Sequence, residues 1–269
     1  TLISPISFDH EAYLGRTLSA IAREKCGILR PGVPAIVGPQ HPAAATAIRQ
    51  ACARLGAPLA IAGEDFRAEA TGDGLRFADA AGTLDLPAPI LPGAHQIQNA
   101  GLAIAAARRL GPLAPDRAAV AAGLRSTRWP ARLQRLDRGR LLRTIRREDE
   151  LWVDGGHNPE AGHAVASFFG SLERRPLRVV LGMLTTKDAT GYLAPLAPQV
   201  DRLVAVDITD SDSAQPPARL VDTARGLGVD AETAGDLKGG LTSLASGAPA
   251  RIAVLGSLYL AGRALAENG

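Results

Sequence analysis

The segment Asp154-Gly-Gly-His-Asn-Pro159 brings a carboxylate, an imidazole and an amide close together in the chain. It follows an apolar run at 151–153 and precedes a helical pattern at 159–172. Where a parallel strand leads into a helix, the helix start offers free N–H groups and the strand end directs side chains into a crevice, so ligands collect there. An Asp or Asn at such a junction also serves as an ordinary helix N-cap. The segment is therefore a candidate ligand site, with capping as the alternative.

Two further candidates lie near the start of the chain. Asp9 and His10 follow an extended segment at 3–8, where such a pair can bind a divalent ion or orient the metal of a phosphate. The alternative is an Asp that caps the next turn beside a partly exposed His. Lys25 closes a predicted helix and Gly27 suits its C′ position, so Lys25 alone is a routine C-terminal lysine.

Asn99 and Arg132 have polar groups that can recognise a nucleotide. His95 and Asn99 lie four residues apart on one predicted helix face, where the amide can bind an adenine edge or a phosphate. Ordinary capping of the helix start is the alternative, and the residues alone favour it. Arg132 lies at the inferred domain junction, where a guanidinium can bridge phosphate oxygens. An interdomain salt bridge is the alternative.

Two other segments follow predicted strands, Gly182-Met-Leu-Thr-Thr-Lys-Asp188 and Gly256-Ser-Leu-Tyr-Leu-Ala-Gly262. Both are predicted on the same sheet edge as Asp154 and His157, where their hydroxyl and N–H groups can receive a carboxylate or phosphate. Neither contains G-x-G-x-x-G, and G-x-x-x-x-G-K-[ST] does not occur in the chain. No motif therefore supports a nicotinamide or flavin role.

The second half of the chain alternates short apolar runs with helical patterns. Such alternation predicts βαβ units, a parallel sheet and helices on both faces, which together describe a Rossmann-like domain. The predicted strands cover 151–153, 177–184, 202–208 and 251–255, and the predicted helices cover 159–172, 188–197, 217–227, 237–245 and 258–267.

The first half is less regular. Turn residues at 72–74 and at 82 predict β-hairpins over 68–86. The boundary is predicted near Trp129-Pro-Ala-Arg132, which gives domains 1–130 and 131–269. The remaining predicted strands cover 35–37 and 59–62, and the predicted helices cover 17–25, 41–55, 96–110 and 116–124.

The composition excludes several classes of protein. Its 269 residues are 46% hydrophobic and 4% aromatic, with a net charge of +3 and scattered basic residues, so nucleic-acid binding is not expected. The basic stretch 135–147 is interspersed with acids and predicts a solvated hairpin. Two cysteines and the absence of a long apolar run indicate the cytoplasm and no membrane insertion. Because the chain opens without Met inside an extended segment, it is expected to be a fragment.

Seven segments, taken in order, resemble the bacterial folylpolyglutamate synthase/dihydrofolate synthase family, whose broader relatives are the Mur ligases. The segments are Ser7-Phe-Asp-His10, Glu24-Lys-Cys-Gly27, His95-Gln-x-x-Asn99, Pro130-Ala-Arg-Leu-Gln134, Asp154-Gly-Gly-His-Asn-Pro159, Gly182-Met-Leu-x-x-Lys-Asp188 and Gly256-Ser-Leu-Tyr-Leu-Ala-Gly262.

This resemblance implies an α/β fold in which the remainder of a P-loop ATPase domain, 1–130, precedes a Rossmann-like glutamate-ligase domain, 131–269. The family's phosphate loop would precede this chain, which is then expected to be inactive alone. The implied activity is ATP- and Mg²⁺-dependent addition of L-glutamate to dihydropteroate or folate through an acyl phosphate, by a monomer. A Mur-type peptide ligase and a non-catalytic Rossmann-like remnant are the alternatives.

Matching residue by residue, the resemblance implies that His10 and Lys25 serve a metal site. Carbamylation of Lys25 would turn its cation into an anion that helps to hold Mg²⁺. Asn99, Arg132 and Asp154 match ATP-binding positions, with Arg132 on the phosphates.

The resemblance also places His157 and Ser257 at the glutamate substrate. The implied catalytic residues are Lys25, Arg132 and His157. Ala131 stands where the family commonly has Gly, and Gly156 where it commonly has Ala. Both exchanges are expected to be tolerated.

Overall fold

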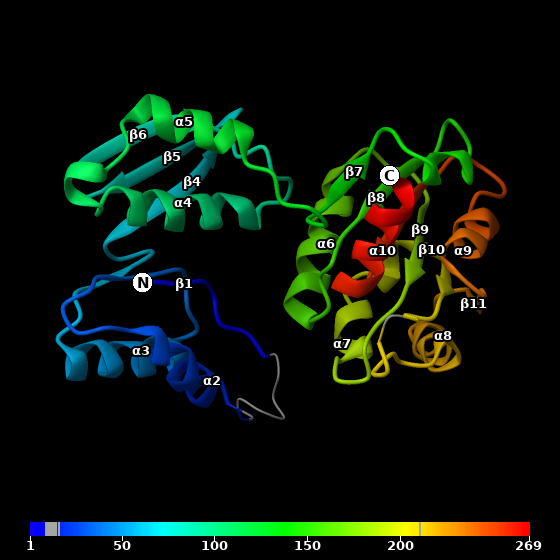
Figure 1. The fold of residues 1–269 in the computed structure, drawn as a ribbon, viewed down its shortest axis with the longest axis horizontal. Coiled ribbons are helices and arrows are strands. Elements are labelled where there is room, and N and C mark those ends of the chain that lie inside the picture. Colours follow the sequence, from blue (N-terminus) through cyan, green and yellow to red (C-terminus); the bar gives the residue numbers. More distant parts are fainter. Residues whose placement is uncertain (9–14, 16, 210) are drawn as a thin grey trace. The chain divides into compact units, whose positions relative to one another are not determined.

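The computed structural model describes residues 1–8, 15, 17–209 and 211–269 (Figure 1). The chain divides into two compact units, Thr1–Arg128 and Trp129–Gly269. None of the helices in the described part of the chain has the length and apolar character that crossing a bilayer requires.

The second unit is built on a six-stranded sheet of order β11-β10-β9-β12-β8-β7. Its strands pair in parallel except β7, which is antiparallel to β8. The predicted parallel sheet is thus confirmed, with one antiparallel edge strand. The strands are β7 (Gln134–Leu136), β8 (Glu150–Val153), β9 (Leu177–Leu181), β10 (Val200–Ala205), β11 (Ala231–Thr233) and β12 (Arg251–Leu255).

Helices cover both faces of this sheet. Alternate strand residues point to opposite sides, and apolar residues on each side are buried against helices. Trp152, Val179 and Leu181 join one buried cluster with three helices, α6 (Pro159–Ser171), α7 (Ala189–Leu193) and α8 (Pro217–Gly226). Leu151 and Val180 join a second cluster, with α9 (Leu237–Leu244) and α10 (Leu258–Asn268). The layers are visible in Figure 1, and they confirm the Rossmann-like prediction.

Neighbouring strands of this sheet end at the same edge. Val254 of β12 is paired with Val153 of β8, and Leu255 of β12 with Leu181 of β9. The segments that follow, beginning at Asp154, Gly256 and Gly182, are therefore adjacent. The sequence prediction that they share one sheet edge is confirmed.

The first unit contains a parallel sheet of order β1-β2-β3. Its strands are β1 (Leu2–Ile3), β2 (Ala35–Val37) and β3 (Leu59–Ile61). Two helices, α2 (Leu18–Lys25) and α3 (Pro42–Leu55), bury their apolar residues in one cluster with this sheet. Thr17 and His41 cap these helices, each accepting a backbone N–H through its side chain.

A second, antiparallel sheet in the same unit has the order β4-β5-β6. Phe66, Phe77 and Leu102 belong to a cluster that also includes Ile36 of β2, so this core is continuous with the parallel sheet. The predicted hairpins are confirmed as β4 (Phe66–Thr71), β5 (Gly74–Asp79) and β6 (Gly82–Pro87), and the helices are α4 (His95–Ala107) and α5 (Arg117–Ser126).

Three sequence predictions require correction. The strand β11 was not predicted, because three residues carry too little periodicity to identify one. The stretch 135–147 covers the end of β7 and most of the connection to β8, but it is not simply solvated, since Leu141 and Ile145 are buried in the core. Gly27 lies in a 3-10 turn, Cys26–Ile28, instead of ending α2 in a left-handed conformation.

Candidate functional site

The turn after β8 is organised around Asp154, whose side chain is buried. Its Oδ1 accepts the Gly156 N–H at 2.7 Å, and its Oδ2 accepts the Leu133 N–H at 2.8 Å. The N-cap of α6 is Asn158, whose Oδ1 accepts the Ala161 N–H at 2.9 Å. The capping interpretation thus applies to Asn158, whereas Asp154 ties two loops together.

Arg132 lies on the second of those loops, just before β7. Its Nη1 donates to the Ala131 carbonyl at 3.1 Å, and the same nitrogen lies 3.4 Å from where a Cβ on Gly155 would stand. No carboxylate among the described residues of the second unit forms an ion pair with Arg132, and the interdomain salt bridge stays an alternative prediction. Arg132 is half-buried, and its guanidinium lies beside the turn that carries Asp154 and His157.

His157 and Ser257 lie at the starts of two helices on this edge. The Nδ1 of His157 is 3.0 Å from the Gly155 carbonyl, which fixes the ring over its own turn. Ser257 is buried and is the N-cap of α10, with its Oγ accepting the Tyr259 N–H at 3.0 Å. A hydroxyl that accepts one bond retains its own proton as a donor.

Tyr192 is a neighbour of this site that the sequence did not reveal. It is fully buried in α7, and its hydroxyl has no hydrogen-bond partner among the described residues. Burial, and secondly the negative charge of Asp154, raise the pKa of Tyr192 well above its usual value. A lone aromatic in a helical pattern predicts only core, so no sequence signal indicated this proximity.

Asn99 lies in the first unit, on the exposed surface of α4. Its Nδ2 donates to the Oε1 of Gln96 at 3.0 Å, and the Nε2 of Gln96 is 3.1 Å from the Nε2 of His95. The N-cap of α4 is Ala94, so the structure does not support a capping role for Asn99. The buried Gln96 connects the two residues that the sequence predicted on one face.

The predicted metal residues can be followed only in part. His10 lies outside the described residues. Lys25 is the exposed last residue of α2, consistent with the routine position at a helix C-terminus. In the part of the chain that the structure describes, no group of three or more His, Cys, Asp or Glu is arranged to hold a metal.

The Ala131 and Gly156 exchanges differ in their structural consequences. Ala131 has a φ of 55°, a left-handed conformation in which glycine avoids a cost that alanine incurs. Gly156 is tightly enclosed, because a Cβ there would lie 2.7 Å from both the Ala161 Cβ and the Asp154 Oδ1. Ala131 is therefore accommodated only in a strained backbone conformation. An alanine at position 156 would require a local shift of the neighbouring atoms.

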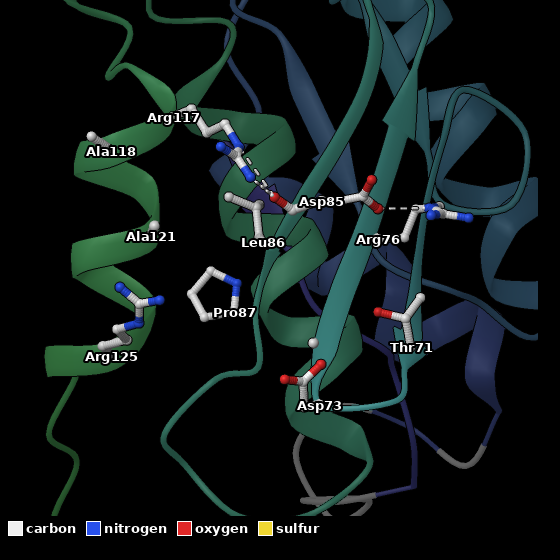
Figure 2. A pocket seen from close by; sticks show the side chains of 11 residues that line it. Thr71, Asp73, Arg76, Asp85, Leu86, Pro87, Arg117, Ala118, Ala121 and Arg125 are labelled. Carbon is white, nitrogen blue, oxygen red and sulfur yellow. Dashed lines mark hydrogen bonds and ion pairs between the residues drawn. The ribbon is translucent and has the colours of Figure 1, made fainter.

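A separate groove in the first unit has a volume of about 850 Å³ and lies between the hairpin strands and α5 (Figure 2). Among its charged groups, Arg76 pairs with the Asp85 carboxylate at 2.7 Å, and Arg117 donates to the backbone carbonyl of Asp85 at 2.7 Å. That hydrogen bond from Arg76 lowers the pKa of the Asp85 carboxyl. None of the predicted site residues lines the groove.

The second unit, which carries the carboxyl-edge residues, matches a known protein family. Residues 138–258 match the family model described as Mur ligase, glutamate ligase domain. The unit that carries Arg132, Asp154, His157 and Ser257 therefore has the fold of a Mur-type glutamate ligase domain.

Whole-chain comparisons specify the family further. The chain is 28% identical to folylpolyglutamate synthase of Lacticaseibacillus casei, over 97% of this chain and 60% of that protein. It is 33% identical to dihydrofolate synthase/folylpolyglutamate synthase of Escherichia coli strain K12, over 74% of this chain and 44% of that protein. A solved structure of E. coli FolC in complex with DHPP and ADP superposes with a TM-score of 0.85 at 28% identity, covering 98% of this chain and 60% of that one.

Over nearly its whole length the chain is similar to folylpolyglutamate synthases and dihydrofolate synthases, and residues 138–258 match the glutamate ligase domain of the Mur ligases. It spans 60% of the length of the L. casei relative and 44% of the E. coli relative.

Proposed function

We propose that the whole protein is an ATP- and Mg²⁺-dependent amide ligase that adds L-glutamate to dihydropteroate or folate through an acyl phosphate. The observation that carries this proposal is the shared sheet edge of Arg132, Asp154, His157 and Ser257, within the unit that matches a glutamate ligase domain. Relatives that bear the names of folate ligases support the choice of substrates.

Each group on this edge suits a different part of the substrates. The Arg132 guanidinium forms no ion pair with a described carboxylate, so its charge is available for phosphate oxygens. The start of α10 and the Ser257 hydroxyl can receive a carboxylate, as expected for glutamate. His157, which directly precedes the Asn158 N-cap of α6 on the same edge, keeps the predicted role of a glutamate-binding and catalytic residue.

The first unit would contribute the remaining groups. The exposed amide of Asn99, oriented by Gln96, suits recognition of the nucleotide. The Lys25 amine is exposed, as carbamylation by carbon dioxide requires, and the carboxylate-like product offers the oxygen ligands that Mg²⁺ prefers. Mg²⁺-bound ATP would supply the phosphoryl group, and His10 completes the proposed metal residues.

We further propose that the reaction takes place in the cytoplasm and that the whole protein is a monomer. The free state of both cysteines, Cys26 and Cys52, supports a reducing compartment.

Phosphate release by the purified whole protein tests the function. Release should require ATP, Mg²⁺, L-glutamate and a pterin acid together, and mass spectrometry should show a product heavier by one glutamyl residue. Equal turnover on a UDP-muramyl peptide would assign the protein to the cell-wall branch instead. ATP binding without turnover on either acceptor would indicate the non-catalytic alternative.

A further inference from the structure

The loop that carries Arg132 has an unusual backbone. Among the described residues, Ala131 and Leu133 are the two non-glycine residues with positive φ, at 55° and 44°. They flank Arg132 directly. L-residues avoid this region, and such strain persists only where the surroundings hold it in place.

Burial fixes both flanking residues, on opposite faces of the sheet. Leu133 belongs to the cluster that includes α6 and α7, whereas Ala131 belongs to the cluster that includes α9 and α10. The loop therefore crosses the edge of the sheet, and the residue between the two buried anchors is directed outward. This arrangement determines where Arg132 emerges, but burial of two apolar side chains does not itself select the left-handed backbone.

Asp154 supplies the bonds that select this backbone. Its Oδ2 accepts the Leu133 N–H and its Oδ1 accepts the Gly156 N–H, and the residue is only 6% exposed. The Gly155 N–H donates to the Ala131 carbonyl at 3.0 Å, which joins the same two loops through the backbone. Hydrogen bonds to a carboxylate are about twice as strong as those between neutral groups. An amide in its place has one oxygen, so it can accept only one of these bonds through oxygen.

We infer that Asp154 is a positioning residue for Arg132: its carboxylate holds the strained 131–133 loop against the 154–156 turn, and its effect on turnover passes largely through the guanidinium. The inference deepens the proposed function and rests on it for the role of Arg132. Direct binding of the nucleotide by Asp154, the expectation from the family resemblance, predicts different behaviour in combined variants.

The kinetic experiment is a double-mutant cycle on the whole protein. Asp154→Asn should lower kcat/KM for ATP by about 10- to 100-fold, yet it should cost less than about twofold more when Arg132 is already alanine. Full additivity of the two losses would show that Asp154 acts independently of Arg132 and would overturn the inference.

A rescue variant sharpens the same test. Ala131→Gly removes the strain that the carboxylate holds, so it should raise kcat/KM of the Asp154→Asn protein several-fold while changing the otherwise unaltered protein by less than about twofold. If Asp154 bound the nucleotide directly, glycine at 131 would not restore that interaction. Absence of any rescue would count against the inference.

A measurement without substrate separates this inference from the proposed function. Hydrogen exchange should show that the Leu133 and Gly156 amides lose protection in Asp154→Asn, whereas core amides such as Val180 keep theirs. Asp236→Asn is the matched control, because that carboxylate caps α9 by accepting the Gly239 N–H at 2.7 Å and does not touch the Arg132 loop. Unchanged protection of Leu133 would refute the positioning role even if ligase activity is confirmed. Lost protection in a protein without ligase activity would sustain the positioning geometry and refute the proposed function.

Discussion

Charged side chains are arranged differently at the two edges of the six-stranded sheet: they form ion pairs at the amino edge, but Asp154 and Arg132 at the carboxyl edge do not pair with each other. At the amino edge, where β8 and β12 begin, Glu150 pairs with Arg251 at 2.9 Å and lies 3.7 Å from both Arg135 and Arg175. Trp152 adds an indole hydrogen bond to the same carboxylate. At the carboxyl edge, by contrast, Asp154 receives backbone N–H groups and Arg132 has no described carboxylate as an ion-pair partner.

Other charged side chains at the amino edge also form ion pairs. The buried Asp149 carboxylate pairs with Arg146 at 3.0 Å, and the largely buried Arg178 side chain pairs with Asp201 at 3.3 Å. A neutralised network stabilises the fold and leaves little for a ligand, whereas a cation held beside a turn and helix starts can still bind an anion. The comparison predicts that substitutions at the amino edge mainly change stability, whereas substitutions at the carboxyl edge mainly change the proposed activity.

The largest effect is expected from removing Arg132. Arg132→Ala should lower turnover by about 10²- to 10³-fold, because the proposed contact of its guanidinium with phosphate oxygens would act where negative charge develops in the transition state. The free energy of unfolding should change by less than about 1 kcal/mol, since the side chain forms no described ion pair. Steady-state kinetics and thermal unfolding check both values. Arg175→Ala at the other edge is the control and should keep full turnover, and a large fall in Tm for Arg132→Ala would contradict the comparison.

Arg251→Met should produce the reverse pattern. Glu150 would lose its shortest ion pair in a largely buried position, so the free energy of unfolding should fall by about 3 kcal/mol, toward the low end for broken buried pairs because two arginines remain nearby. Turnover per folded molecule should be unaffected. Urea unfolding and active-site-normalised kinetics measure the two quantities, and lost turnover with intact stability would reverse the assignment of the edges.

Gly156→Ala tests how tightly the carboxyl edge is built. The added Cβ would meet the Ala161 Cβ and the Asp154 Oδ1, so we expect a loss of about 1–3 kcal/mol in stability, as for other overpacked sites. Gly262→Ala is a suitable control, because a Cβ there meets nothing within 4 Å and alanine favours the helix. Equal stabilities of the Gly156→Ala and parent proteins would show that the turn can relax.

Ala131→Gly should stabilise the protein by about 0.5–1 kcal/mol, a smaller effect of opposite sign. Relief of the left-handed strain is the favourable part, and the greater freedom of glycine in the unfolded chain offsets some of it. Chemical denaturation at matched conditions gives the difference. A lower midpoint in the glycine variant would mean that φ at 131 is not strained in solution.

The smallest effect concerns acid stability at the amino edge. Burial raises the pKa of Glu150, but the Trp152 hydrogen bond and the charges of Arg251 and Arg135 outweigh it, so the net pKa is below its usual value. A lowered folded-state pKa contributes stability that is present above the unfolded value, about 4.5, and is lost as pH falls through the folded value. The free energies of unfolding of the parent and of Glu150→Gln, measured between pH 7 and 3, should therefore become equal at low pH. If the two proteins instead lost stability in parallel as the pH fell, Glu150 would not contribute to the acid sensitivity of the fold.

Much of the fold was predictable because its signals are local. The apolar runs that became β8, β9 and β12 and the helical patterns that became α6, α8 and α10 each carry periodicity or length enough to identify them. Short elements failed for the same reason: β11 has three residues, and α7 spans only 189–193 of the predicted 188–197. The basic stretch 135–147 was misjudged because its three buried apolar residues, Leu136, Leu141 and Ile145, lie among many charges.

The features of the candidate site were likewise predictable only where their signals are local in the sequence. The types and order of residues placed Asp154, His157 and Ser257 at strand ends, and parallel strand pairing then required these ends to be neighbours. The left-handed conformations at 131 and 133, the fully buried Tyr192 beside Asp154, and the carboxylate that joins two loops 21 residues apart left no trace in composition or spacing.

The sequence alone determined the family, the alternation of strands and helices, and the chemical groups on the carboxyl edge, because these follow from residue types and local periodicity. Only the tertiary structure decided that Asp154 joins two loops instead of capping α6, and that Arg132 emerges between two strained residues. Those facts depend on contacts between segments distant in the chain, and such contacts exist only once the sheet has assembled.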